Sequence, residues 1–331
     1  MNYKESQEIL VEINKAKKIL LACHQGVDPD SITSNLLLKT YLEIIGKEAD
    51  IVIADEIPDV YRMFDGENKI KQKIDFSKFD FSKYDLFLTC DVNGLKRLGI
   101  EDLKVVGDIK IINIDHHEGV FDGTLYISDT SYSCTAEMIF YLLDDFGFKF
   151  DKDSAELVLS GIISDTDSFD YGISPRVFKT VSRLIELGAD YDKIKFWLLR
   201  NNSELQLKFW SKILVNLHVD YENKFAYTYM SHKEFKGFEG VVHPTRTASD
   251  MFIRTIKDTD FGMAMLEETK GELKISIRSR QNNYGVVDLC RQLGGGGHFN
   301  GGGAMVAGLP FEKAVKKVLE TARKYAKENK I

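Results

Sequence analysis

A histidine and two carboxylates directly follow an apolar run near the start of the chain. Residues 18–34 read KILLACHQGVDPDSITS, in which ILLAC has the length and composition of a buried strand. His24, Asp28 and Asp30 follow, and no Lys or Arg stands after them until Lys39. Imidazole and carboxylate groups transfer protons and bind metal ions. This stretch is therefore a candidate metal or acid–base site that lacks a cationic side chain of its own.

Acidic and imidazole side chains recur at the ends of further apolar segments. Asp91 closes DLFLTCD, and Asp115, His116 and His117 close IKIINIDHH. A fourth segment, GIISDTDSF, ends an apolar helical pattern with Asp165. Ligand crevices in open parallel sheets lie beyond the carboxyl ends of the strands. We therefore expect these side chains to meet at one edge of a sheet.

Several carboxylates in one place repel one another unless a cation compensates them. Oxygen ligands with some imidazole suit Mn²⁺, with Mg²⁺ as the alternative, and the lack of thiolates argues against structural zinc. Two such ions would serve phosphoryl hydrolysis. Taken singly, Asp28 and Asp30 could begin the helix SITSNLLLK with a serine cap, and Asp165 could be a turn residue. The recurrence of four such segments favours the metal interpretation.

The elements that would position these residues alternate between strand and helix patterns. Residues 51–55, 85–91 and 109–117 are β-branched apolar runs of strand length, and helical patterns separate them. This alternation predicts an α/β fold with an N-terminal, mostly parallel sheet flanked by helices. Helical patterns then continue to about residue 216, and strand patterns return. The predicted organisation is an N-terminal domain, a helical linker and a smaller C-terminal α/β domain, with boundaries at 1–186, 187–215 and 216–331.

The composition is that of an ordinary globular protein. The chain has 331 residues, 44% of them hydrophobic and 29% charged. The first residues, MNYKESQEIL, lack the order of a signal peptide, and no apolar run approaches the roughly 18 residues of a membrane span. We expect a cytoplasmic protein without a membrane partner. The cysteines stand far apart without a CxxC pair, which is typical of reduced thiols: Cys23, Cys90, Cys134 and Cys290.

Charge is distributed unevenly along the chain. The net charge is −7, which argues against long duplex DNA as a partner. Residues 1–210 carry about −12 and residues 211–331 about +5. An acidic first part could hold metal ions and a basic second part could hold an anion. Drift of surface charge would produce the same division.

The C-terminal part contains two further candidate segments, SIRSR and GGGGH. Glycine lets backbone N–H groups approach an anion closely, and Arg278 could donate charge-assisted hydrogen bonds to phosphate. No GK[ST] motif is present, and the glycines do not open the first βα turn as a dinucleotide site would require. A flexible glycine loop without function is the alternative.

The four N-terminal segments resemble the motifs of the DHH phosphoesterases, over most of residues 15–185. Asp115-His116-His117 resembles the signature triplet, and CDVNGLKRLG resembles the second motif. The chain departs from the family pattern at three positions, where the family usually has Pro, Gly and Gly: Val27, Pro29 and Thr33. The first and fourth motifs are matched by His24, Asp28, Asp30 and Ser34, and by Gly161, Ile162, Asp165, Thr166 and Phe169.

The resemblance implies a role for each of these residues. One ion would be held by His24, Asp28 and Asp91. The other would be held by Asp30, Asp91, His116 and Asp165, so that Asp91 bridges the pair. His117 would act in catalysis next to the phosphate or leaving group, and Asp115 would orient its neighbours.

The C-terminal segments resemble the first subfamily of DHH-associated domains, which bind substrate in nanoRNases, pAp phosphatases and RecJ nucleases. The implied function is dinuclear-metal hydrolysis of short oligoribonucleotides, dinucleotides or 3′-phosphoadenosine 5′-phosphate. The sequence does not rank these substrates, and it leaves a homodimer open. The alternatives are a catalytically weak nucleotide-binding or sensing protein and an exonuclease on longer single strands. The residues implied to bind phosphate are Arg278, Ser279, Gly295, Gly296, Gly297 and His298.

Overall fold

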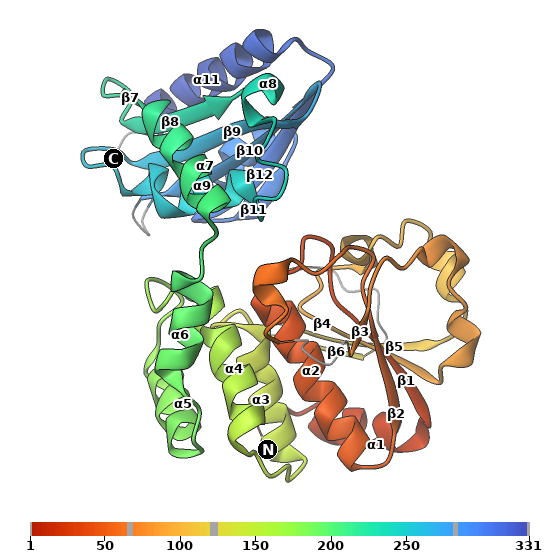
Figure 1. The fold of residues 1–331 in the computed structure, drawn as a ribbon. Coiled ribbons are helices and arrows are strands. Elements are labelled where there is room, and N and C mark those ends of the chain that lie inside the picture. Colours follow the sequence, from red (N-terminus) through yellow and green to blue (C-terminus); the bar gives the residue numbers. More distant parts are fainter. Residues whose placement is uncertain (1, 65–68, 120–124, 281–283, 330–331) are drawn as a thin grey trace. The chain divides into compact units, whose positions relative to one another are not determined.

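The chain forms two compact units, residues 1–201 and residues 202–331, here called unit 1 and unit 2. The computed structural model describes residues 2–64, 69–119, 125–280 and 284–329 (Figure 1). The predicted linker, 187–215, contains helices on both sides of the division between the units. The three-part boundaries proposed from the sequence stay a prediction.

Unit 1 contains a six-stranded sheet in the order β3-β2-β1-β4-β5-β6, and all of its neighbouring strands are parallel. The predicted α/β class with a mostly parallel sheet is confirmed. The strand order reverses between β1 and β4, where open sheets of this kind form their ligand crevice. The short strands β3 and β6 were not predicted, and β2 begins earlier than its apolar pattern. The strands are Lys18–Ala22, Glu48–Val52, Ile70–Lys71, Leu86–Cys90, Lys110–Asp115 and Leu125–Ser128 for β1 to β6.

Both faces of this sheet are covered. Alternate residues of β1 enter different cores, Ile19 beneath the helices and Leu20 on the opposite face beside Phe76 and Phe81. Helix α2 packs against α3 and α4 (Figure 1). The helices are Ser6–Lys15, Pro29–Ile44, Thr135–Asp145, Lys152–Asp165, Pro175–Glu186 and Tyr191–Arg200 for α1 to α6, with 3₁₀ turns at Asp59–Tyr61, Phe76–Lys78, Phe81–Lys83, Leu95–Leu98 and Leu103–Val106.

Helix α2 begins two residues before the predicted start. Asp28 is its N-cap and accepts a hydrogen bond from the Ser31 amide at 3.2 Å. Pro29 occupies the first turn, where its fixed φ suits a helix and its missing N–H costs nothing. The departure from the family pattern at Pro29 is therefore a helix start.

Unit 2 contains a second six-stranded sheet in the order β11-β12-β10-β9-β8-β7. Its pairs are antiparallel except β8–β9, which is parallel. Two separate cores lie in this unit, one with α10 and α11 and the other with α7 and α9. Strands β7 to β12 are His218–Asp220, Phe225–Met230, Phe261–Thr269, Glu272–Ser279, Gly296–His298 and Gly301–Ala307, and the helices are Glu204–Val215, His232–Phe235, Pro244–Met251, Val287–Gln292 and Phe311–Glu328 for α7 to α11, with a 3₁₀ turn at Ile253–Thr255.

The GGGGH segment was expected to be a loop, but most of it forms a strand. Strand β11 pairs with β12, with Gly297 opposite Gly302. A Cβ on Gly297 would lie 2.4 Å from the Gly301 carbonyl oxygen, so glycine is required for the two strands to approach this closely.

No helix in the described part of the chain is long and apolar enough to cross a membrane.

Candidate metal centre

The predicted ligands of unit 1 lie where the strand order reverses. His24 follows the end of β1, Asp91 follows β4, and Asp115 is the last residue of β5, with His116 after it. Strand β4 lies between the other two, so the three chain segments meet. Asp91 is 4% exposed and Asp115 is fully buried, which makes this a concentration of charge inside the protein.

The first group of potential ligands consists of His24, Asp28 and Asp91. The Nε2 atom of His24 lies 3.6 Å from Asp28 Oδ1 and 3.4 Å from Asp91 Oδ2. Its Nδ1 atom lies 2.8 Å from the Gln25 carbonyl oxygen. Because a carbonyl only accepts, Nδ1 donates, and Nε2 is left to face the two carboxylates. Asp28 therefore combines the capping role with a position beside His24.

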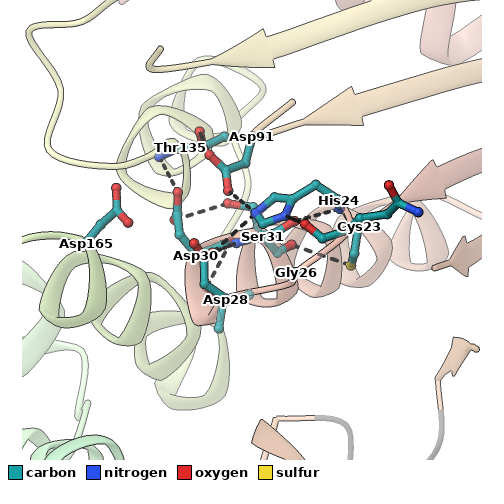
Figure 2. A network of polar contacts seen from close by, with 12 residues as sticks. Cys23, His24, Gly26, Asp28, Asp30, Ser31, Asp91, Thr135 and Asp165 are labelled. Carbon is teal, nitrogen blue, oxygen red and sulfur yellow. Dashed lines mark hydrogen bonds and ion pairs between the residues drawn. The ribbon is translucent and has the colours of Figure 1, made fainter. Parts of the chain in front are cut away.

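The second group consists of Asp30, His116 and Asp165. His116 Nε2 lies 3.1 Å from Asp165 Oδ2, at the end of α4, and 3.8 Å from Asp91 Oδ1. Figure 2 shows Asp165 facing the cluster from α4, while Asp30 lies at the first turn of α2. The two oxygens of Asp91 thus face different groups, Oδ2 towards His24 and Oδ1 towards His116.

Asp30 is fixed by the beginning of α3. The amides of Thr135 and Ala136 donate to its Oδ2 and Oδ1 atoms at 2.8 and 2.9 Å. Gly161 on α4 makes room for this carboxylate, because a Cβ there would lie 2.7 Å from Asp30 Oδ1. The sequence analysis missed Thr135 and Ala136. The helical pattern beginning at residue 134 was recognised, but nothing in the sequence connects its first amides with a carboxylate 105 residues earlier.

His117 is held by the neighbouring aspartate. Its Nδ1 atom lies 2.7 Å from Asp115 Oδ1, and its backbone amide donates to the same oxygen at 2.9 Å. An ionised carboxylate accepts only, so the imidazole Nδ1 carries the proton. The structure therefore brings Asp115 and His117 together as an oriented pair.

The cluster is electrostatically unfavourable without a cation. Burial raises the pKa of Asp30 well above its usual range, and the nearby Asp91 and Asp165 add to this shift. Burial also raises the pKa of Asp91. Burial alone would lower the pKa of His24, but Asp28 and Asp91 raise it to about 10. These shifts mark a concentration of buried negative charge.

The donor set fits divalent metal ions. Among the described residues, His116 Nε2 is buried without a hydrogen-bond partner, although Asp165 Oδ2 lies only 3.1 Å away. These two atoms form an ion pair and lie on one side of the same group of potential ligands. Carboxylate oxygens with imidazole nitrogens that converge in this way are typical ligands of a divalent ion.

The predicted phosphate-binding residues lie together in unit 2. Arg278 is opposite Gly301 in the β10–β12 pair, and its Nη1 atom donates to the Gly302 carbonyl at 3.2 Å. The Ser279 hydroxyl donates to the Asn300 carbonyl at 3.1 Å. Gly295 precedes β11, and Gly296, Gly297 and His298 form it, although the side chain of His298 lies outside the described part of the structure.

The sequence analysis also missed a partner of Arg278. Its Nε atom donates to Asp250 Oδ1 on α9 at 2.6 Å. Arg246, on the same helix, lies 3.7 Å from the other oxygen of Asp250. Nothing in the linear pattern connects residues 246–250 with residue 278. The contact exists because α9 packs against β10.

Comparisons with known proteins agree with this geometry. Residues 18–162 match the family model described as DHH family, N-terminal domain. The chain is 28% identical, over 97% of its length and 94% of the relative, to the bifunctional oligoribonuclease and PAP phosphatase NrnA of Thermus thermophilus. It is 24% identical, over 95% of its length but 48% of the relative, to the cyclic-di-AMP phosphodiesterase GdpP of Bacillus subtilis. The crystal structure of an exopolyphosphatase-related protein from Bacteroides fragilis superposes with a TM-score of 0.88 at 26% identity, covering 99% of this chain and 98% of the other.

Proposed function

We propose, since residues 18–162 match the model of the DHH family N-terminal domain, that this chain is a DHH phosphoesterase that hydrolyses short nucleotide substrates at a centre of two divalent ions. The observation that carries the proposal is the position of Asp91. Its oxygens face His24 on one side and His116 on the other, as a carboxylate shared by two ions would.

The proposed ligands divide between the two ions. His24, Asp28 and Asp91 would hold one, and Asp30, Asp91, His116 and Asp165 the other. Two imidazoles among the ligands favour Mn²⁺ over Mg²⁺, which prefers an all-oxygen set. When bound, such ions lower the pKa of water and neutralise charge on a reacting phosphoryl group.

The side chains around the centre supply the remaining functions. Asp115 holds the His117 ring through Nδ1, so that Nε2 can bind the phosphate or hold a proton for the leaving oxygen. Burial alone would lower the pKa of His117, but Asp115 and Asp91 raise it, which favours the donor form. His117 is therefore proposed to be the acid at the leaving group.

Unit 2 is proposed to bind the substrate phosphate. Arg278 supplies a fixed guanidinium, because Asp250 and the Gly302 carbonyl hold its Nε and Nη1 atoms. Ser279 and the glycines of β11 would add a hydroxyl and backbone amides. His298 is included from the sequence alone.

The proposed substrates are short oligoribonucleotides, dinucleotides and 3′-phosphoadenosine 5′-phosphate. The Thermus relative, which matches nearly the full length of this chain, is named for activities of this kind. A purified-protein panel with Mn²⁺ or Mg²⁺ would test the proposal on pApA, pAp, cyclic di-AMP, pyrophosphate and a long single strand. We expect Mn²⁺-dependent release of mononucleotide or phosphate from pApA or pAp, at rates above those on the long strand.

Two variants control this test. Asp165→Asn removes a proposed ligand, whereas Asp102→Asn changes an exposed aspartate that caps a 3₁₀ turn of the same unit. Activity should be lost in the first variant and kept in the second. Nucleotide binding without hydrolysis in the wild type would favour a sensing protein, and faster cleavage of the long strand would favour an exonuclease.

A further inference from the structure

Thr135 contacts one carboxylate from each ligand group without belonging to either. Its amide donates to Asp30 Oδ2 at 2.8 Å, and its hydroxyl donates to Asp91 Oδ1 at 3.3 Å. The residue is fully buried. Figure 2 shows Thr135 beside Asp30, with Asp91 next to it. A single residue therefore connects the end of β4 with the first turn of α2.

The beginning of α3 is built so that this amide is available. The first N–H groups of a helix have no acceptor within it, and Cys134 Sγ, the N-cap atom, accepts from the Glu137 amide instead. The buried Glu137 side chain in turn accepts from the amide and hydroxyl of Ser133, at 3.0 and 2.9 Å. These contacts hold the residues before and after Thr135, and so they fix its position.

The backbone of Asp91 is fixed by other groups, and side chains contact its carboxylate: His24 faces Oδ2, and Thr135 and the two histidines after β5 face Oδ1. Asp91 has a φ of 59°, and its amide donates to the Ile114 carbonyl at 3.0 Å. The Asn113 amide group donates to the Val92 carbonyl and to the Thr89 hydroxyl, both at 2.9 Å, on either side of Asp91. The remaining freedom is rotation of the carboxylate, which decides where each oxygen points.

We propose that Thr135 is a positioning residue: its hydroxyl sets the rotation of the Asp91 carboxylate, and so keeps Oδ1 directed at the His116 side of the centre. The contact is on Oδ1, which lies 3.8 Å from His116 Nε2 and 3.5 Å from His117 Nδ1, and not on Oδ2, which faces His24. The inference rests on the proposed metal centre and is independent of the substrate.

The test compares three variants by direct titration of the metal-free protein with Mn²⁺, without substrate. Thr135→Val keeps the shape and the backbone amide but removes the hydroxyl, and Thr135→Ser restores it. Thr40→Val is the matched control, because the hydroxyl of Thr40 on α2 donates to the Leu36 carbonyl at 2.9 Å. Partners that orient metal ligands typically change affinity about 10- to 100-fold, so we expect about a 10-fold loss for Thr135→Val at one of two binding steps.

Thr135→Ser should bind Mn²⁺ within about two-fold of the wild type, and Thr40→Val should be unchanged, by the same reasoning. Circular dichroism and the melting temperature of each metal-free variant separate misfolding from weak binding. Wild-type Mn²⁺ affinity in Thr135→Val would overturn the inference. An equal loss of affinity in Thr135→Ser would also overturn it, because it would show that side-chain volume and not the hydroxyl determines the affinity. Absence of Mn²⁺ binding by the wild type would overturn the proposed centre itself, whereas binding without hydrolysis would overturn only the proposed function.

Discussion

The clustered carboxylates of unit 1 and two aspartates of unit 2 have different kinds of partner. In unit 1, Asp91 and Asp165 have histidines as their ion-pair partners, and Asp30 accepts hydrogen bonds from backbone amides. In unit 2, Asp250 contacts Arg278 at 2.6 Å and Asp220 contacts Arg323 at 2.8 Å. The cluster in unit 1 gathers buried negative charge, whereas Asp250 and Asp220 of unit 2 each have a neighbouring arginine.

The direction of the pKa shifts expresses the same contrast. Burial and the neighbouring carboxylates raise the pKa of Asp30. Burial would also raise the pKa of Asp220, but hydrogen bonds from Arg323 and Asn223 outweigh it and lower this pKa below its ordinary value. A raised carboxyl pKa marks a place where positive charge is missing. The cluster in unit 1 is therefore suited to bind a cation. Arg278 of unit 2, which Asp250 and the Gly302 carbonyl hold in place, is suited to bind an anion.

The largest expected effect comes from removing Asp91, the carboxylate of unit 1 that is proposed to be shared by the two ions. We expect Asp91→Asn to reduce kcat by about 10³-fold or more, because losing several kcal/mol of charge stabilisation corresponds to that factor. Asp220→Asn, the same change in unit 2, should leave kcat near the wild-type value. Steady-state hydrolysis of the best substrate at saturating Mn²⁺ measures both. Similar losses in the two variants would contradict the contrast between the units.

Metal binding should stabilise unit 1 and leave unit 2 almost unchanged. The chain has two tryptophans, Trp197 in α6 of unit 1 and Trp210 in α7 of unit 2. Trp210→Phe therefore leaves a probe of unit 1, and Trp197→Phe leaves a probe of unit 2. At a free Mn²⁺ concentration of about 100 times Kd, the expected stabilisation is about 2.7 kcal/mol.

Thermal unfolding followed by fluorescence, with Mn²⁺ and with EDTA, measures this difference. For a unit of this size, that stabilisation should raise the midpoint temperature of unfolding by roughly 5–10 °C in the Trp210→Phe protein. The Trp197→Phe protein should show little change. Equal shifts in both proteins would mean that the two units unfold together, and no shift in either would remove the case for a metal centre.

The sequence predicted unit 1 well because its signals are local. Each proposed ligand stands within a few residues of a strand or helix end, and parallel strands bring those ends together. The DHH triplet illustrates this, since Asp115 ends β5 and His116 and His117 follow it. The joint geometry of the metal ligands could be expected before the fold was known, although their roles stay proposals.

The parts that could not be predicted depend on packing between distant segments. Asp250 meets Arg278 because α9 lies on β10, and no spacing in the sequence encodes that contact. Thr135 meets Asp91 because α3 begins beside the end of β4. The glycines of β11 were expected to form a loop, since composition does not reveal that Gly297 allows a close strand pair. Tertiary contact decided each of these cases.

Removing the guanidinium of Arg278 should weaken substrate binding more than catalysis. A hydrogen bond to a charged group contributes about 1.5–3 kcal/mol, so we expect Arg278→Ala to raise KM about 10- to 100-fold with a smaller change in kcat. The matched control is Arg323→Ala, which removes an arginine from an equivalent ion pair with Asp220. Steady-state kinetics on pAp or pApA separate KM from kcat. An unchanged KM in Arg278→Ala would remove Arg278 from the proposed phosphate site.

The smallest expected effect is a dependence of the stability of unit 2 on pH. Because the folded-state pKa of Asp220 is lowered, the unfolded chain takes up the proton first as pH falls. The contribution of the Asp220–Arg323 pair is therefore complete at neutral pH, and it is lost as pH decreases from about 5 through the folded-state pKa. Urea unfolding of the Trp197→Phe protein at several pH values follows this loss, and adding Asp220→Asn should reduce its acid sensitivity. An identical pH profile with and without Asp220→Asn would show that the Asp220–Arg323 pair contributes nothing to the stability of unit 2.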